Sequence, residues 1–414
     1  MTAQPSLQQL IERYKKLDSA LIYDTLDAMG LPQQQLDLFL PARPPARPVA
    51  QPAAPAAAAP QTPAAAPQQQ ALPAAAPQNG ATPLQVPVPP SGRLVAITNA
   101  TILTATHGTI EHGTILIRDG RIAEVGTNVQ VPAGAQVIDG TGKFVMPGII
   151  DSHSHTALEA VNEGTNSVTS EVRVEDVLRE DGGAIFRELA GGVTSIQVYH
   201  GSANTIGGQS SLLKLRYGLP VDSLFFQGAP LGLKFALGEN VKQSNQSQTP
   251  GRERRYPATR MGVEEVLRDA FTRARSYQRE WQAYETARRA LRRGQAEPVP
   301  PRTDLQLQPL VEVLENRRLA HVHAYRSDEM LMMMRVARDF GFRVASFEHG
   351  LEGYKIANEL AAAGTAVSTF ADFWAYKLEA WDAIPENAAL MAERGVTVAI
   401  NSDDNERARR LYQE

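Results

Sequence analysis

The segment PGIIDSHSHT, which spans Pro147–Thr156, is the most informative part of the sequence because it joins an apolar run to two histidines at the end of that run. Before it, short β-branched runs predict a small antiparallel β module, and Asp119-Gly120 predicts a type I′ hairpin turn within the module. After it, seven further strand-like runs alternate with helical stretches. We therefore expect an α/β fold in which a (β/α)8 TIM barrel follows a small β-sandwich module.

Composition divides the 414 residues, which include 28 prolines, into four parts. We expect an N-terminal helical segment at 1–40, a Pro/Ala-rich disordered linker at 41–92, the β module at 93–146 and the barrel at 147–414. The arginine-rich stretch at about 251–302 interrupts the alternation of strands and helices. A helical insertion is expected there, either as a solvated lid or as a basic recognition surface.

The composition also limits the chemistry and the partners. The absence of cysteine excludes disulfides, Cys-ligated zinc and a thiol nucleophile. The formal net charge of −4 gives no reason to expect nucleic acid or a membrane as a partner, and the sequence leaves oligomerisation open. The sequence lacks an apolar signal segment and a transmembrane run, so a cytoplasmic location is expected.

Four of the eight histidines form two His-x-His pairs, His153/His155 and His321/His323. Because side chains in a strand alternate with a period of two, each pair projects two imidazoles onto the same face. His153 and His155 follow an apolar run, which places them at the C-terminal end of a strand, where catalytic groups gather in parallel barrels. His321 lies one step deeper than His323, so we expect it to support the site rather than to bind metal.

Two later strand-like runs end on comparable residues, His349 in VASFEHG and Asp403 in VTVAINSDD. Imidazole nitrogens and carboxylates are the ligands that zinc, manganese and iron accept in proteins. The pattern therefore predicts a metal site built from residues at the tops of several strands: His153, His155, His323, His349 and Asp403.

In combination, PGIIDSHSHT, HVHAYRSDE, FEHG and INSDD resemble the amidohydrolase superfamily of metal-dependent hydrolases, nearest its imidazolonepropionase-like and prolidase-like members. The resemblance runs from about Leu94 to the end of the chain. It implies that the residues just named, His153, His155, His323, His349 and Asp403, bind one or two divalent metal ions, and Zn²⁺ is the metal expected. Many members also use a carboxylated lysine or a glutamate to bridge two metals. Lys234 and Glu239, both in LGLKFALGENVK, compete for this role, and the alternative is that neither binds metal. Glu239 is favoured because it stands just past the apolar run and its carboxylate binds metal without modification, whereas Lys234 lies five residues deeper and would first have to react with carbon dioxide.

The resemblance implies hydrolysis of a C–N bond, in a cyclic amide or a short peptide, by a water molecule that the metal activates. Asp403 is expected to act as the general base and to return the proton to the leaving amine. His200, Tyr325 and Arg326 are candidates for contacts with a small-molecule or short-peptide substrate. The alternatives are deamination of a heterocyclic amine at the same site and a catalytically silent fragment that serves as a binding module.

Two parts of the chain depart from the family pattern. The chain ends eleven residues after Asp403, so we expect a C-terminally truncated barrel whose last helix is incomplete. Near the N-terminus, RYKKLDSALIYDTLDAMGLP is similar to the opening helices of the RraA-like family, without the rest of that domain. No catalytic role is expected for this stretch.

Overall fold

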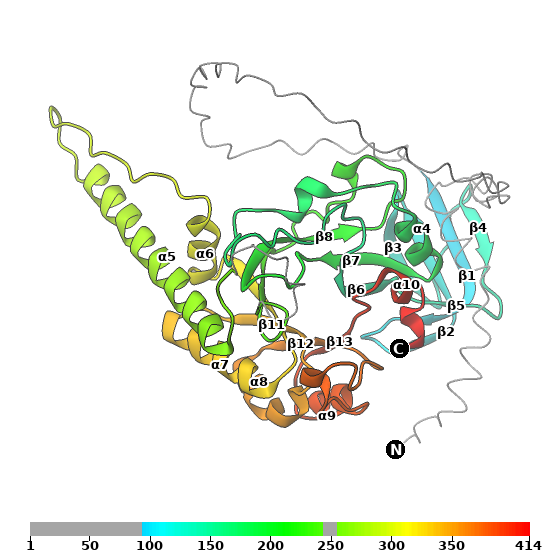
Figure 1. Cartoon of the computed structure of the whole chain (residues 1–414). Coiled ribbons are helices and arrows are strands. Elements are labelled where there is room, and N and C mark those ends of the chain that lie inside the picture. Colours follow the sequence, from blue (N-terminus) through cyan, green and yellow to red (C-terminus); the bar gives the residue numbers. More distant parts are fainter. Residues whose placement is uncertain (1–92, 243–254) are drawn as a thin grey trace, which may run out of the picture. The chain divides into compact units, whose positions relative to one another are not determined.

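The structure, a computed structural model, describes residues 93–242 and 255–414 and divides into two compact units, Met1–Val145 and Met146–Glu414 (Figure 1). Three sequence predictions fall outside the described residues in whole or in part: the helical segment at 1–40 with its RraA-like stretch, the linker at 41–92, and the start of the insertion at 251–254.

The described part of the first unit forms one five-stranded sheet in the order β3-β2-β1-β4, with β5 paired to β1. Its strands are β1 (Leu94–Leu103), β2 (Thr109–Arg118), β3 (Arg121–Gly126), β4 (Gln136–Asp139) and β5 (Phe144–Val145). Neighbours among β1, β2 and β3 are antiparallel, whereas β4 and β5 run parallel to β1. Asp119 and Gly120 turn the chain at φ values of 50° and 73°, the left-handed conformation that the predicted type I′ turn requires. A sandwich needs two sheets. The described residues of this unit, 93–145, form a single sheet, so the sandwich stays a prediction.

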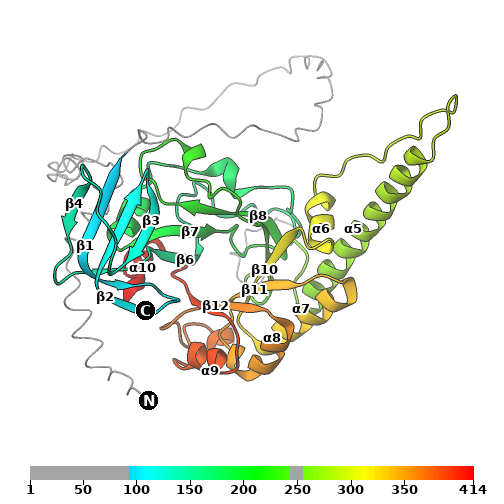
Figure 2. The ribbon, with the colours of Figure 1, turned by 180° about the vertical axis from the view of Figure 1, so that it is seen from behind.

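The second unit is a mixed α/β structure around eight strands that nearly close into a barrel (Figure 2). The sheet order is β13-β12-β11-β10-β9-β8-β7-β6. The strands are β6 (Ile149–Ser154), β7 (Val193–Val198), β8 (Ile206–Lys214), β9 (Leu231–Ala236), β10 (Arg318–Ala324), β11 (Val344–His349), β12 (Ala366–Thr369) and β13 (Val398–Ile400). The prediction of eight strands in this part of the chain is confirmed.

The expectation of a regular (β/α)8 barrel, with all strands parallel, is wrong at β8. This strand runs antiparallel to both of its neighbours, β7 and β9, whereas the other pairs in the barrel are parallel. The connection from β7 to β8 is only the short segment 199–205. A parallel crossover needs a dozen or more residues, so this connection can only turn the chain back.

Hydrogen bonds beyond the strand ends join β6 to the segment after β13. The backbone N–H of Asp403 donates to the His153 carbonyl at 3.1 Å. The Ser402 hydroxyl and backbone N–H donate to the buried Asp151 carboxylate at 2.5 and 3.1 Å. Burial raises the pKa of Asp151 to about 6, against the opposing effect of these hydrogen bonds. These hydrogen bonds link the two edge strands of the sheet near the first histidine pair.

Seven α-helices of the second unit are described: α4 (Gly183–Ala190), α5 (Arg260–Arg289), α6 (Leu307–Leu314), α7 (Ser327–Phe340), α8 (Ala357–Ala363), α9 (Asn387–Glu393) and α10 (Asn405–Ala408). Short 3-10 turns lie at η1 (Val174–Val177), η2 (Val221–Ser223), η4 (Gly353–Ile356), η5 (Leu378–Ala380) and η6 (Leu411–Gln413). Among the described residues, no helix is both long and apolar enough to span a membrane.

Helix α5 accounts for most of the arginine-rich stretch at 251–302 and has two different halves. One face of its first half is buried, and the ring of Phe271 on that face stacks on those of Phe235 and Phe342 at centroid distances of 6.0 and 4.5 Å. Beyond Tyr277 most side chains are exposed, and this end projects away from the barrel (Figures 1 and 2). The first half of the expected insertion is therefore part of the helical layer that covers the barrel.

Candidate metal centre

The first histidine pair lies where β6 ends. His153 is the fifth residue of the six-residue strand and is fully buried, whereas His155 lies one residue beyond the strand and its side chain is 20% exposed. Their rings are 5.1 Å apart between centroids. The spacing of two residues brings both imidazoles to one face, and the end of the strand leaves the second one open to the barrel mouth.

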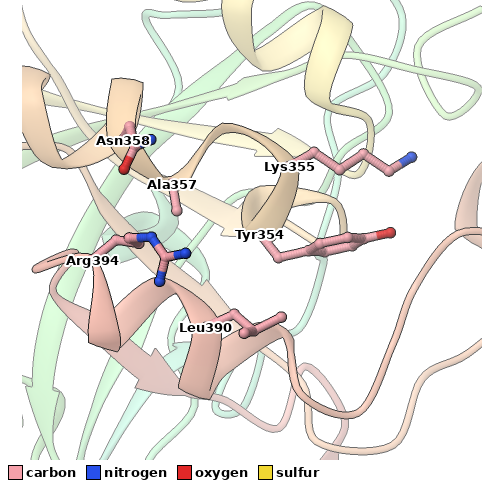
Figure 3. A pocket seen from close by; sticks show the side chains of 6 residues that line it. All are labelled: Tyr354, Lys355, Ala357, Asn358, Leu390 and Arg394. Carbon is pink, nitrogen blue, oxygen red and sulfur yellow. The ribbon is translucent and has the colours of Figure 1, made fainter.

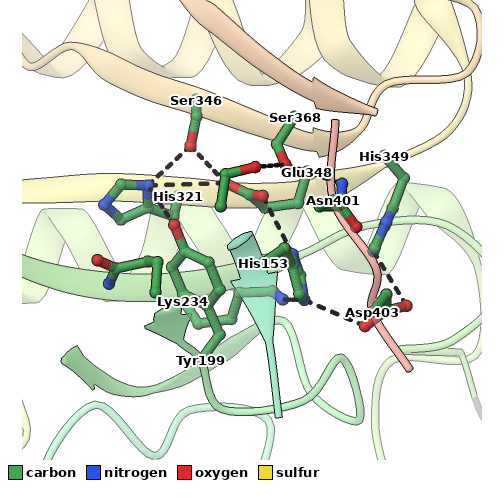
Figure 4. Close-up of polar contacts among 12 residues, drawn as sticks. His153, Tyr199, Lys234, His321, Ser346, Glu348, His349, Ser368, Asn401 and Asp403 are labelled. Carbon is green, nitrogen blue, oxygen red and sulfur yellow. Dashed lines mark hydrogen bonds and ion pairs between the residues drawn. The ribbon is translucent and has the colours of Figure 1, made fainter. Parts of the chain in front are cut away.

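Asp403 contacts three of the predicted histidines, and Figure 4 shows its contacts with His153 and His349. Its Oδ1 atom lies 3.3 Å from His153 Nε2 and 3.2 Å from His155 Nε2. Its Oδ2 atom lies 3.9 Å from His349 Nε2. The ligand atoms of His153, His349 and Asp403 all lie within 4.8 Å of one another, a group that could hold a metal ion. Although burial raises the pKa of Asp403, the neighbouring histidines lower it well below its usual value.

Left-handed backbone brings two of these side chains inward. His349 has a φ of 75° and Asp403 a φ of 49°, a conformation that few residues other than glycine adopt. At His349 it interrupts the alternation of β11, so that Glu348 and His349, adjacent in sequence, both contact His153. Backbone strain of this kind is common at functional sites.

The hydrogen bonds of His153 and His155 fix where their protons lie. His153 Nδ1 is 3.0 Å from Glu348 Oε2, and His155 Nδ1 is 2.9 Å from the Tyr199 carbonyl. Both partners can only accept, so each Nδ1 carries the proton, and a neutral ring then has its lone pair on Nε2. Burial and the nearby positive charge of Lys234 lower the pKa of His153 to about 4, which keeps this ring neutral at pH 7. Lone pairs of two imidazoles and one carboxylate therefore converge on one place.

The other two predicted ligands carry unpaired nitrogens. Both ring nitrogens of His323 and the Nδ1 atom of His349 are buried, and none of them has a hydrogen-bond partner within residues 93–242 and 255–414. Burial lowers the pKa of each of these histidines well below its usual value. The rings are held by packing: His349 stacks on Phe370 at 4.9 Å, and His323 meets Tyr325 edge-on at 4.8 Å. Unpaired buried nitrogens beside converging lone pairs fit a divalent metal ion, the group that the family resemblance implies.

The two candidates for a bridging ligand lie in different places. Lys234 is fully buried in β9, and its Nζ atom is 3.3 Å from His153 Nε2. Burial lowers the pKa of Lys234 to about 8. Glu239 lies three residues beyond β9, where its backbone N–H donates to Glu379 at 2.9 Å. Among the described residues, no ion pair joins the Glu239 carboxylate to the histidines.

Of the three candidates for substrate contact, only Tyr325 borders the cluster, by which we mean His153, His155, His323, His349 and Asp403. Its ring stacks on that of His349 at 5.3 Å, and its hydroxyl lies 2.6 Å from that of Tyr376. Both ring nitrogens of His200 are engaged, Nδ1 with the Gly201 carbonyl and Nε2 with a backbone N–H. Arg326 is exposed and pairs with Asp328 through two 3.0 Å hydrogen bonds.

Sequence reasoning did not identify Glu348 as a site residue. This carboxylate is fully buried and contacts His153, yet it lies directly before the predicted ligand His349. The segment VASFEHG contained a signal for it. A glutamate is almost never fully buried unless it is paired, so a glutamate inside an apolar strand indicates a buried partner. Tyr199 was also missed, since its contribution to His155 is a backbone carbonyl that any residue could supply.

A separate pocket of about 180 Å³ lies between α8 and α9, away from these residues (Figure 3). It is lined by Tyr354, Lys355, Ala357, Asn358, Leu390 and Arg394. None of the site residues predicted from the sequence lines this pocket.

Comparisons with known proteins identify the family. No protein-family model matches the chain. The crystal structure of an amidohydrolase from Thermotoga maritima MSB8 is 34% identical, covers 75% of this chain and 78% of its own, and superposes with a TM-score of 0.66. The chain belongs to the amidohydrolase superfamily.

Two curated relatives match over part of their length. The amidohydrolase tasK of Hapsidospora irregularis is 27% identical over 317 residues, which are 70% of this chain and 32% of tasK. The imidazolonepropionase of Ralstonia nicotianae is 34% identical over 112 residues, 26% of each protein. The chain thus matches a third or less of these curated relatives.

Proposed function

We propose that the protein is a metal-dependent amidohydrolase that hydrolyses a C–N bond in a cyclic amide or a short peptide. The observation that supports this most directly is the convergence of the His153 and His155 lone pairs on Asp403 Oδ1, at 3.3 and 3.2 Å. Acceptors brought together without a proton between them repel one another unless a cation lies among them. The names of the relatives, amidohydrolase and imidazolonepropionase, are consistent with the reaction class.

We assign the metal to His153, His155, His323, His349 and Asp403. Imidazoles with a carboxylate are a donor set that suits Zn²⁺, which we propose as the metal. When bound, such an ion polarises a carbonyl oxygen and lowers the pKa of a coordinated water towards about 7.

Asp403 is the proposed general base. Its low pKa keeps the carboxylate ionised at neutral pH, so it can accept a proton, and its side chain is 25% exposed, so it can reach a substrate. The contacts with His153 and His155 hold Oδ1 in place, while Oδ2 lies farther from its nearest histidine, His349. The proton that Asp403 accepts would be returned to the departing amine.

For the bridging position we propose Lys234 rather than Glu239, because only Lys234 contacts a member of the cluster. Its amine would attack carbon dioxide to form a carbamate and release one proton. Lys234→Met should lower the metal content of the purified chain, whereas Glu239→Gln should leave it unchanged. The reverse result would return the role to Glu239. Among the substrate-contact candidates, we retain Tyr325.

The deciding experiment measures metal content by elemental mass spectrometry in the parent and in the double variant His153→Ala/His155→Ala. The matched control is His107→Ala/His112→Ala, which removes two exposed histidines from the first unit. We expect one or two equivalents of metal in the parent and the control, and none in the test variant. A folded parent without metal would contradict the proposal.

The reaction is tested with the metal-loaded parent on dipeptides, hydantoins and dihydropyrimidines, with a parallel assay for ammonia release. Ring opening or peptide cleavage without ammonia supports the proposed amidohydrolase. Ammonia release from a heterocyclic amine would instead favour the deaminase alternative. A metal-loaded chain inactive on all of these substrates would contradict the proposed reaction.

A further inference from the structure

The buried carboxylate of Glu348 lies on the inner side of His153, opposite Asp403 (Figure 4). Its Oε2 atom is 3.0 Å from His153 Nδ1, and Asp403 Oδ1 is 3.3 Å from Nε2 of the same ring. A neutral imidazole has one N–H, so these two carboxylates compete for a single proton. If the proton lay on Nε2 and were donated to Asp403, the Nε2 lone pair that the proposed metal site needs would be lost.

Glu348 is itself held at its other oxygen. The Ser346 hydroxyl donates to Glu348 Oε1, and since it has a single hydrogen, Ser346 must accept from its other partner. That partner is His321, whose Nδ1 atom lies 2.7 Å from Ser346 Oγ and 3.1 Å from the Tyr199 hydroxyl. Hydrogen bonds on both oxygens fix the plane of the Glu348 carboxylate.

A third contact supports the same position of the proton. Lys234 Nζ lies 3.3 Å from His153 Nε2, and nitrogen-bound hydrogens of lysine can only be donated. This contact is favourable when Nε2 has a lone pair and unfavourable when it carries a hydrogen. The contacts of His153 with Glu348 at Nδ1 and with Lys234 at Nε2 therefore both favour protonation at Nδ1.

We propose that Glu348 is a positioning residue that keeps the proton of His153 on Nδ1 and thereby presents the Nε2 lone pair to the metal site. Ser346 and His321 hold Glu348 in the orientation that this requires. Carboxylates that orient a metal-binding histidine in this way typically change metal affinity by about 10–100-fold when they are removed. The inference rests on the proposed function only where it assigns the Nε2 lone pair to metal binding. The position of the proton on His153 is a property of the metal-free chain and is tested separately.

The first test therefore uses the metal-free protein. Long-range ¹H–¹⁵N correlation spectra of the full chain, labelled in histidine and treated with chelator, report which nitrogen of each ring is protonated. The His153 signals are assigned with His153→Gln. We expect protonation at Nδ1 in the parent and a shift of the proton to Nε2, facing Asp403, in Glu348→Leu. Protonation at Nε2 in the parent would overturn the proposal without any variant.

The second test measures Zn²⁺ affinity by competition with a chromophoric chelator. We expect affinity to fall about 10–100-fold in Glu348→Leu and by less in Ser346→Ala, which removes only one anchor of the carboxylate. The control Glu329→Gln changes another buried carboxylate, which pairs with Arg260, and should bind like the parent. If Glu348→Leu does not fold, the comparison of Ser346→Ala with the parent decides. Weaker Zn²⁺ binding by Ser346→Ala supports the proposal, and equal binding contradicts it.

The two proposals fail in different ways. A parent that binds no Zn²⁺ but protonates His153 at Nδ1 contradicts the proposed metal function and leaves the role of Glu348 in fixing the proton intact. A parent that binds Zn²⁺, with Glu348→Leu and Ser346→Ala binding equally well, contradicts the role of Glu348 and leaves the metal function intact.

Discussion

The two His-x-His pairs have the same spacing but different surroundings. His155 lies just beyond β6, so both members of the first pair reach Asp403. Both members of the second pair lie inside β10, and His321 contacts Ser346 and Tyr199 instead of the cluster. A spacing of two residues thus sets the face that two side chains share, while the end of the strand decides which of them reaches the mouth of the barrel.

Asp403→Asn should have the largest effect, because it removes the acceptor shared by the first pair. The amide preserves the shape but cannot act as a base, so we expect hydrolysis to fall about 10²–10⁴-fold. Its NH₂ group can donate to the Nε2 lone pairs, so the metal-free variant should be at least as stable as the metal-free parent. Steady-state kinetics and urea unfolding with chelator measure the two effects. A less stable metal-free variant would contradict the convergence of lone pairs.

The comparison is tested directly by His155→Ala beside His321→Ala. Loss of a residue that only supports a metal ligand lowers metal affinity about 10–100-fold. Because His155 is a proposed ligand, His155→Ala should lower Zn²⁺ affinity by more than this, with little change in metal-free stability. The second removes the His321 partner of the Ser346 and Tyr199 hydroxyls and should cost about 1–3 kcal/mol of metal-free stability. Chelator competition and urea unfolding separate the two. Equal losses of affinity would show that the pairs are equivalent.

Acidification should weaken the metal-free fold through the buried member of the first pair. The pKa of His153 is about 4 in the folded chain and about 6.5 when unfolded, so below pH 6.5 the unfolded state binds more protons. The neutral His153 ring contributes up to about 3 kcal/mol to the free energy of unfolding above about pH 7. This contribution is lost as the pH falls from 6.5 to 4.

His153→Gln isolates this effect from Asp151 and Glu188, whose pKa values burial raises to about 6 and about 8 and whose contributions therefore grow on acidification. Urea unfolding of parent and variant between pH 4 and 8, with chelator, measures the difference. The stability of the parent relative to the variant should decline below pH 6.5. A difference independent of pH would contradict a neutral buried His153.

The sequence predicted the eight barrel strands because buried β-branched runs ending in polar residues carry a local signal. It did not predict the direction of β8, which depends on the length of the connection before it, or Glu348, whose partner His153 lies 195 residues away. The preference for Glu239 over Lys234 rested on its carboxylate, which binds metal without modification, and on its position just past the apolar run. Which of the two reaches the cluster depends on where β9 ends, and boundaries are the least certain part of a pattern.

Arg326 gives the smallest expected effect and tests whether closeness in sequence to a site residue has functional meaning. It directly follows Tyr325, which stacks on His349, yet its guanidinium is exposed and paired with Asp328. Exposed pairs of this kind contribute about 0–1 kcal/mol. Arg326→Gln should therefore change kcat/KM by less than about twofold, whereas Tyr325→Leu, which removes the stacked ring, should lower it several-fold. A large rise in KM for Arg326→Gln with unchanged kcat would show that the side chain turns toward a bound substrate, and would extend the site from β10 into the first turn of α7.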